Sequence, residues 1–173
     1  MNPRYRSHSI RLPWWDYSQA GGYFVTICTQ DRQCVLGEIV EGSVVLSPAG
    51  LIVEEEWRRT ATVRQHVCLD DFVVMPNHIH GIVVLTGDPG KTSQLDVSTK
   101  KANLKPNSLG AIIGQFKSVS TKRIRGAGFP KFGWQARFYE HLIRDEPSLG
   151  NIRQYIVDNP AKWELDADNP KNF

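Results

Sequence analysis

Two apolar, β-branched runs at residues 70–75 and 78–85, separated only by Pro76-Asn77, constrain the fold more than any other part of the sequence. Runs of this length and composition predict strands, and a Pro-Asn break between them predicts a tight antiparallel pair or a bent strand. The middle of the chain therefore predicts two paired strands of a sheet.

Aromatic and β-branched side chains at residues 22–29 predict an earlier strand, and residues 35–46 predict a hairpin that turns at Glu41-Gly42-Ser43. Ser47-Pro48 then predicts the start of a helix that runs to about residue 64, because a capping side chain precedes a proline at the first helical position.

Three elements are expected after the central pair. Ser108 predicts the cap of a helix that extends to residue 125, and residues 134–143 predict a strand. Asp145-Glu146-Pro147 opens a last helix, which must end near Asn159 because Pro160 follows it.

Without the hairpin at residues 35–46, the order of elements is β-α-β-β-α-β-α. This order predicts an α+β fold with a ferredoxin-like antiparallel sheet, two helices on one face and an appended C-terminal helix on the other. The second face would be shared with a substrate, as in nucleic-acid-binding sheets. We expect one domain over residues 1–173, with a basic, aromatic arm at 1–20, a flexible loop at 86–107 and a tail at 161–173.

The composition, with 40% hydrophobic and 23% charged residues, is that of an ordinary globular protein. No stretch approaches the roughly 20 apolar residues that span a bilayer, so we expect a cytoplasmic protein without a membrane partner. The three cysteines have no CxxC spacing, which favours buried free thiols over a disulfide or a thiolate metal site.

Positive charge is unevenly distributed, although the net charge is only +3. Residues 97–139 contain no acidic side chain, which suits a surface that neutralises phosphates, whereas the simpler interpretation is that each cation is solvated surface. The candidate DNA contacts in this window and in the arm are Arg4, Arg6, Arg11, Lys117, Lys122, Arg123, Arg125, Lys131 and Arg137.

His78 and His80 are two residues apart in an expected strand, so both imidazoles lie on one face of the sheet. Ile79, Val83 and the other residues of the opposite set can then pack against helices. Two imidazoles on one face suit a metal ion, although such pairs are more often hydrogen-bonded or surface residues than ligands.

The last helix has a buried stripe at Leu149, Ile152 and Ile156, and Tyr155 and Asn159 lie on the shoulder of that stripe. If this helix covers the histidine face, a phenol and an amide oxygen reach the imidazoles. The alternative is that Tyr155 is a residue at the edge of the core and Asn159 only ends the helix.

Several segments resemble one transposase family. Residues 74–81, VMPNHIHG, resemble the MPNHxH motif of the HUH single-tyrosine transposases. Residues 133–141, GWQARFYEH, and 155–160, YIVDNP, resemble the WQxxFWEH and YIxxNP segments of one branch, the REP-associated tyrosine transposases. Residues 23–31, YFVTICTQD, are similar to the first strand of that branch, so the resemblance covers nearly the whole chain.

The resemblance implies that His78 and His80 bind a metal, that Tyr155 is the nucleophile, and that Asn159 is a third ligand. Nitrogen and oxygen ligands without thiolate or carboxylate favour Mg²⁺ or Mn²⁺, with zinc left open. The family's chemistry is nicking and rejoining of single-stranded or hairpin DNA through a 5'-phosphotyrosine, by a monomer or a homodimer. Trp14, Trp15 or Phe132 could stack on unpaired bases, although core packing is their simpler role.

Two departures from the family pattern limit the transfer. Tyr139 stands where the family usually has tryptophan, which makes Tyr139 a lesser candidate nucleophile, and residues 161–164 lack the family's small-residue pattern. Two rival functions also stay open: a non-catalytic nucleic-acid-binding module of the same fold, and a small metal-dependent hydrolase that acts on another phosphate ester.

Overall fold

The computed structural model describes residues 20–86 and 107–172. The predicted arm, most of the predicted loop at 86–107 and Phe173 lie outside the described residues. Arg4, Arg6, Arg11, Trp14 and Trp15 belong to that part of the chain, so their predicted contacts with DNA stay predictions. Among the described residues, no helix combines the length and apolarity that a membrane crossing requires.

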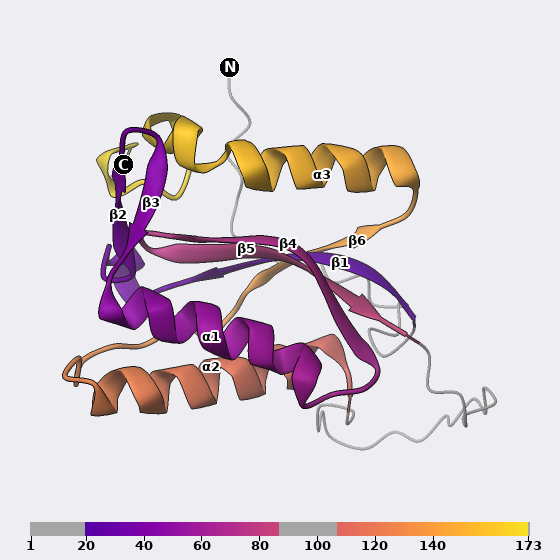
Figure 1. Ribbon diagram of the computed structural model, residues 1–173, viewed down its shortest axis with the longest axis horizontal. Helices are drawn as coiled ribbons and strands as arrows, with labels where there is room; N and C mark the ends of the chain where they lie inside the picture. Colours follow the sequence, from indigo (N-terminus) through magenta and orange to yellow (C-terminus); the bar gives the residue numbers. More distant parts are fainter. Residues whose placement is uncertain (1–19, 87–106, 173) are drawn as a thin grey trace.

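The centre of the fold is a four-stranded antiparallel sheet with the strand order β4-β5-β1-β6 (Figure 1). A separate two-stranded hairpin, β2-β3, turns at Glu41 and Gly42, both of which have positive φ. The strands are β1 (Gly21–Cys28), β2 (Gly37–Val40), β3 (Ser43–Leu46), β4 (Val67–Met75), β5 (His78–Leu85) and β6 (Tyr139–Ile143).

Each of the three α-helices begins where the sequence offers a capping side chain. Ser47, Ser108 and Asp145 each accept a hydrogen bond from the backbone N–H three residues later, which satisfies a donor at the helix start. The helices are α1 (Pro48–Thr62), α2 (Leu109–Gly126) and α3 (Glu146–Asp158), and the short 3₁₀ helices are η1 (Gln30–Arg32), η2 (Pro160–Leu165) and η3 (Pro170–Asn172).

The helices form two layers around the sheet. In Figure 1, α1 and α2 cover one face and α3 crosses the other, as the predicted ferredoxin-like fold with an appended helix requires. The main core lies between the sheet and α1 and α2, and it includes Ile79, Val83 and Trp57. A smaller core of Phe24, Ile82 and Ile156 joins the sheet to α3, with Leu149 and Ile152 packed against it.

Some boundaries differ from the prediction. β4 begins at Val67 and has an irregularity between Leu69 and Phe72, where the pairing with β5 shifts. β6 begins only at Tyr139, because the preceding residues leave the sheet and only Trp134 forms an isolated bridge, to Thr29.

Phe132 cannot stack on a base in this conformation, because its side chain is 5% exposed and belongs to the main core. The stacking role considered for Phe132 is therefore wrong, and the simpler packing role is confirmed. The three cysteines are free, as expected, but Cys34 and Cys68 are exposed rather than buried.

Gly81 tests how tightly β5 packs on α1. A Cβ atom at this position would lie 2.5 Å from Cζ2 of Trp57, so we expect Gly81→Ala to lower the free energy of unfolding by about 1–3 kcal/mol. Gly114→Ala in α2 is the matched control, since nothing lies within 4 Å of its Cβ position, and it should raise stability by about 0.5–1 kcal/mol. Urea denaturation measures both, and equal effects would contradict the packing described.

Candidate active site

Both histidines of β5 lie on the sheet face that α3 covers. The alternation along β5 sends Ile79 to the opposite core, and His80 pairs with Thr26 of β1 and with Val73 of β4. His78 is 0% exposed and His80 is 2% exposed. The face predicted to stay open for a substrate is therefore closed over the imidazoles themselves.

Each imidazole makes one hydrogen bond through Nδ1 and faces the other imidazole through Nε2. Nδ1 of His78 lies 2.8 Å from Oδ1 of Asn77, and Nδ1 of His80 lies 2.8 Å from Oγ1 of Thr26. The two Nε2 atoms are 3.0 Å apart. Partners at Nδ1 hold both rings with Nε2 directed to a common point, as the outer partners of metal-binding histidines do.

Burial keeps both rings neutral at physiological pH. Desolvation lowers the pKa of His80 to about 3, and desolvation followed by the neighbouring His80 lowers the pKa of His78 well below its usual value. Neutral imidazole is the form that binds a metal ion. The rings are therefore ready to act as ligands without first losing a proton.

Tyr155 reaches this pair from α3 of the same chain. Its hydroxyl oxygen lies 3.3 Å from Nε2 of His80, and its ring centroid lies 5.2 Å from that of His80. Phe24 stacks on His80 and meets the Tyr155 ring edge-on, which fixes the angle between them. Tyr155 is 48% exposed, so its side chain contacts both the buried ring of His80 and the solvent.

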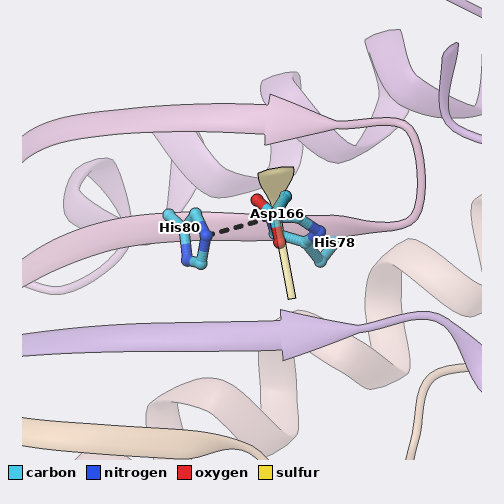
Figure 2. A group of neighbouring side chains, drawn as sticks. All are labelled: His78, His80 and Asp166. Atoms are coloured by element: carbon cyan, nitrogen blue, oxygen red, sulfur yellow. Dashed lines mark hydrogen bonds and ion pairs between the residues drawn. The ribbon is translucent and has the colours of Figure 1, made fainter. Parts of the chain in front are cut away.

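Two buried side-chain oxygens of the C-terminal part have no hydrogen-bond donor within the described part of the chain. They are Oδ1 of Asn159, at the end of α3, and Oδ2 of Asp166, just after η2. Oδ2 of Asp166 lies 3.9 Å from Nε2 of His78, and Figure 2 shows this carboxylate beside the two rings. Burial raises the pKa of Asp166, while the backbone N–H of Asp168 and the Asn159 side chain lower it by hydrogen bonding.

The donor atoms fit a small divalent cation. Donors at about 2.1 Å from an octahedral cation are about 3.0 Å apart when adjacent and about 4.2 Å apart when opposite. The Nε2 atoms of His78 and His80 are 3.0 Å apart, and all three donors, including Asp166, lie within 4.8 Å of one another. A small contraction would bring them around one ion, which would also satisfy the unpaired carboxylate oxygen.

Comparisons with known proteins found relatives in sequence and in fold. No family model matches the chain. An uncharacterised protein of Haemophilus influenzae is 34% identical over 162 residues, which are 91% of this chain and 90% of that protein. A second Haemophilus influenzae protein, named as a REP-associated tyrosine transposase, is 26% identical over 152 residues, which are 85% of this chain and 74% of that protein.

A solved structure shares the fold. It is that of a REP-associated tyrosine transposase bound to a REP hairpin, and it matches 95% of this chain and 76% of its own chain with a TM-score of 0.59 and 20% identity. The chain is similar to the REP-associated tyrosine transposases in sequence and in fold. Its MPNHxH segment forms the turn from β4 into β5, and its YIxxNP segment forms the end of α3.

Tyr139 lies two strands away from His80 in the same sheet. Tyr139 opens β6 and pairs with Thr26, which in turn pairs with His80. Two strand spacings of about 4.8 Å therefore put roughly 10 Å between the Cα atoms of Tyr139 and His80. Tyr139 is 37% exposed, and its ring meets Phe24 edge-on.

Three of the predicted phosphate contacts are used inside the protein. Nζ of Lys117 donates to the backbone oxygens of residues 135 and 137, and burial lowers its pKa to about 8. Arg123 forms ion pairs with Glu55 and Glu56 that join α2 to α1, and Nε of Arg125 donates to the Phe132 oxygen. The exposed candidates among the described residues are Lys122, Arg125, Lys131 and Arg137.

Sequence reasoning missed the contribution of the tail, residues 160–172. Arg32 pairs with the Asp168 carboxylate at 2.8 Å and donates to the Ala167 oxygen, while Nδ2 of Asn77 donates to the Asp168 oxygen at 2.8 Å. Trp163 is 8% exposed and anchors η2. An aromatic residue followed by two closely spaced acids was the available signal, but it did not say where the tail docks.

The low pKa of His80 predicts a loss of stability in mild acid. Its folded pKa, about 3, lies below its unfolded value of about 6.5, so below that value the unfolded chain takes up a proton that the native protein does not. Between pH 7 and pH 5 this one residue should lower the free energy of unfolding by roughly 2 kcal/mol.

Urea denaturation at both pH values, in EDTA, measures this loss. In the His80→Gln variant the loss between pH 7 and pH 5 should be smaller than in the wild type by roughly 2 kcal/mol. An equal loss in the two proteins would show that His80 is not buried in its neutral form.

Proposed function

We propose that the protein nicks single-stranded or hairpin DNA and transfers the cut strand, with Tyr155 as the nucleophile. The similarity to a REP-associated tyrosine transposase supports a transposase role, and the structure with the same fold is bound to a REP hairpin. His78 and His80 would bind a divalent cation, with Asn159 and Asp166 as the oxygen donors. The active site would be complete within one chain.

The observation that carries the proposal is the contact between Tyr155 and His80. A phenol oxygen lies 3.3 Å from a ring nitrogen whose neighbour at 3.0 Å is a second neutral imidazole. The phenol is half exposed while the imidazoles are buried, so a phosphate that arrives from solvent would meet the nucleophile first. The alternative role of Tyr155, packing at the edge of the core, does not require contact with a pair of neutral imidazoles.

Tyr155 would attack the phosphorus atom of the scissile phosphate through its hydroxyl oxygen. The P–O bond to the 3' oxygen breaks, and that oxygen takes a proton from water, which leaves a 5'-phosphotyrosine and a free 3'-hydroxyl. Tyrosine has an unperturbed pKa near 10, so the attacking hydroxyl must lose its proton during the reaction, and the half-exposed ring allows that proton to reach water. A 3'-hydroxyl from another strand can reverse the step and join the strands.

The donor set favours Mg²⁺ or Mn²⁺. When bound, either cation would polarise the scissile phosphate and offset the charge that develops on its oxygens. Two imidazoles, an amide oxygen and a carboxylate oxygen supply hard donors without thiolate. Asp166 adds a negative charge to the ligands expected from the sequence, which were two imidazoles and an amide oxygen.

DNA would be gripped by exposed cations outside this centre. Lys122 lies on α2, which covers the sheet face opposite to α3. Lys131 and Arg137 lie on the connection that leads from α2 to β6. The arm residues Arg4, Arg6 and Arg11 are further proposed contacts. Each phosphate contact should make binding depend on salt concentration.

Replacement of the nucleophile tests the reaction. With labelled single-stranded DNA hairpins and Mn²⁺, the wild type should form a protein–DNA adduct that survives denaturing electrophoresis. Tyr155→Phe should lower adduct formation by at least about a thousandfold, because it removes the attacking oxygen. Tyr139→Phe, which removes the hydroxyl of the other candidate, should leave adduct formation unchanged.

An adduct that persists in Tyr155→Phe would overturn the assignment of the nucleophile. Hairpin binding by the wild type without any adduct would instead support the non-catalytic module.

Replacement of Asp166 tests the donor set without DNA. Asp166→Asn removes the charge of the carboxylate, so calorimetry should show Mn²⁺ affinity lowered by tenfold or more, which is about 1.4 kcal/mol. Asp158→Asn makes the same change in charge at a residue paired with Lys162 and should change the affinity little. Equal affinities in all three proteins would remove Asp166 from the proposed ligands.

A further inference from the structure

Asn77 leaves its neighbour His78 a single tautomer. Nδ2 of Asn77 donates to the backbone oxygens of Arg32, at 3.0 Å, and Asp168, at 2.8 Å, so both amide hydrogens are engaged. The amide orientation is thereby fixed, and Oδ1 is the atom that faces Nδ1 of His78 at 2.8 Å. An amide oxygen only accepts hydrogen bonds, so Nδ1 of His78 carries the hydrogen and Nε2 carries a lone pair.

Thr26 imposes no such choice on His80. Its Oγ1 lies 2.8 Å from Nδ1 of His80, and a hydroxyl can donate to that nitrogen or accept from it. On the other side of the ring, the Tyr155 hydroxyl lies 3.3 Å from Nε2 of His80 and can also donate or accept. The contact that differs between the two tautomers is therefore the one of 3.0 Å between Nε2 of His80 and Nε2 of His78. Since the His78 atom has a lone pair, this contact is a hydrogen bond only if His80 carries its hydrogen on Nε2.

A cation between the rings requires the other tautomer of His80. Both Nε2 atoms must then present lone pairs to the ion, so the hydrogen of His80 must lie on Nδ1 and be donated to Thr26. His78 needs no change, because Asn77 already holds its hydrogen on Nδ1. Before a cation binds, His78 therefore already has the tautomer that binds a metal, whereas His80 has to change its tautomer.

We propose that Asn77 locks His78 in its metal-binding tautomer, while the hydroxyl of Thr26 lets His80 exchange tautomers when a cation enters. Without a cation, His80 donates from Nε2 to His78 and accepts from Thr26 at Nδ1. On binding, Nε2 gives its proton to water, Nδ1 takes one from water, and the Thr26 hydroxyl turns from donor to acceptor. The charge of the ring is the same before and after.

Asn77 and Thr26 are thus positioning residues, which act through the histidines. Asn77 also joins the site to the tail, because the same amide that orients His78 binds the backbone of residue 168. The proposal rests on the proposed cation site and not on the nicking reaction, so it is tested without DNA.

Nuclear magnetic resonance of ¹⁵N-histidine-labelled protein reads the tautomers directly. Single substitutions of each of the five histidines, His78 and His80 included, assign every signal to its residue. In EDTA, we expect the hydrogen of His78 on Nδ1 and that of His80 on Nε2. With Mg²⁺ alone, at a concentration where calorimetry shows binding, His78 should stay as it is and the hydrogen of His80 should move to Nδ1.

Three results would overturn the proposal. They are a hydrogen on Nε2 of His78 in the metal-free protein, a His80 tautomer that bound Mg²⁺ leaves unchanged, and no binding of Mg²⁺, Mn²⁺ or Zn²⁺ at all. Failure of the adduct assay together with the expected tautomers would contradict the nicking reaction but not this proposal.

Variants of Thr26 separate positioning from packing. Thr26→Val keeps the shape of the side chain but removes the hydroxyl, so Mg²⁺ affinity should fall by about 10–100-fold. Thr26→Ser keeps the hydroxyl and should restore affinity to within about threefold of the wild type. Equal affinities for the valine and serine variants, with both proteins folded, would show that the hydroxyl has no role at His80.

Discussion

The alternation of side chains along β5 separates the main core on one face of the sheet from the candidate site on the other. Ile79 and Val83 enter the main core against α1 and α2, while His78 and His80 face α3. A shift of register by one residue would exchange the two sets and put imidazoles into hydrocarbon. Pairing with β1 on one side and β4 on the other holds the register, so the position of the histidines is fixed by backbone hydrogen bonds along the whole strand.

Placement of the tyrosine depends on α3. The apolar stripe of Leu149, Ile152 and Ile156 packs α3 onto the sheet. A bidentate ion pair then joins Arg153 to Asp70 of β4, with contacts of 2.9 and 2.6 Å. Two-point attachment of this kind fixes the rotation of a helix about its axis. Tyr155, two residues beyond Arg153, is thereby directed to His80.

Burial and chemistry are linked at the candidate site. Closure by α3 and the tail keeps the imidazoles neutral, but it also buries oxygens of Asn159 and Asp166 that have no donor among the described residues. Each such oxygen costs about 1–3 kcal/mol unless something compensates it. In the proposed function, a cation would compensate both oxygens at once. The polar groups that weaken the packing would then be the groups that the chemistry needs, a conflict that is common at functional sites.

The sequence by itself determined the elements and the face on which the site lies. Capping residues such as Ser47 and Ser108 mark helix starts through bonds to the next few residues, and the period of two in β5 puts both histidines on one face. These features are local, so a short stretch of sequence contains their cause. The aromatic run before Tyr139 was misleading, because Trp134 packs against α2 and bonds Ser120 instead of extending β6.

Tertiary structure alone decided what completes the site. Asp166 approaches His78 where Arg32 of η1, more than 130 residues earlier, binds the tail at residues 167 and 168. Contacts between other distant segments engage Lys117 and Arg123, which the sequence analysis made candidate contacts with DNA. Pairings between distant segments depend on the sum of many weak contacts in the folded chain, and a short stretch of sequence does not determine that sum.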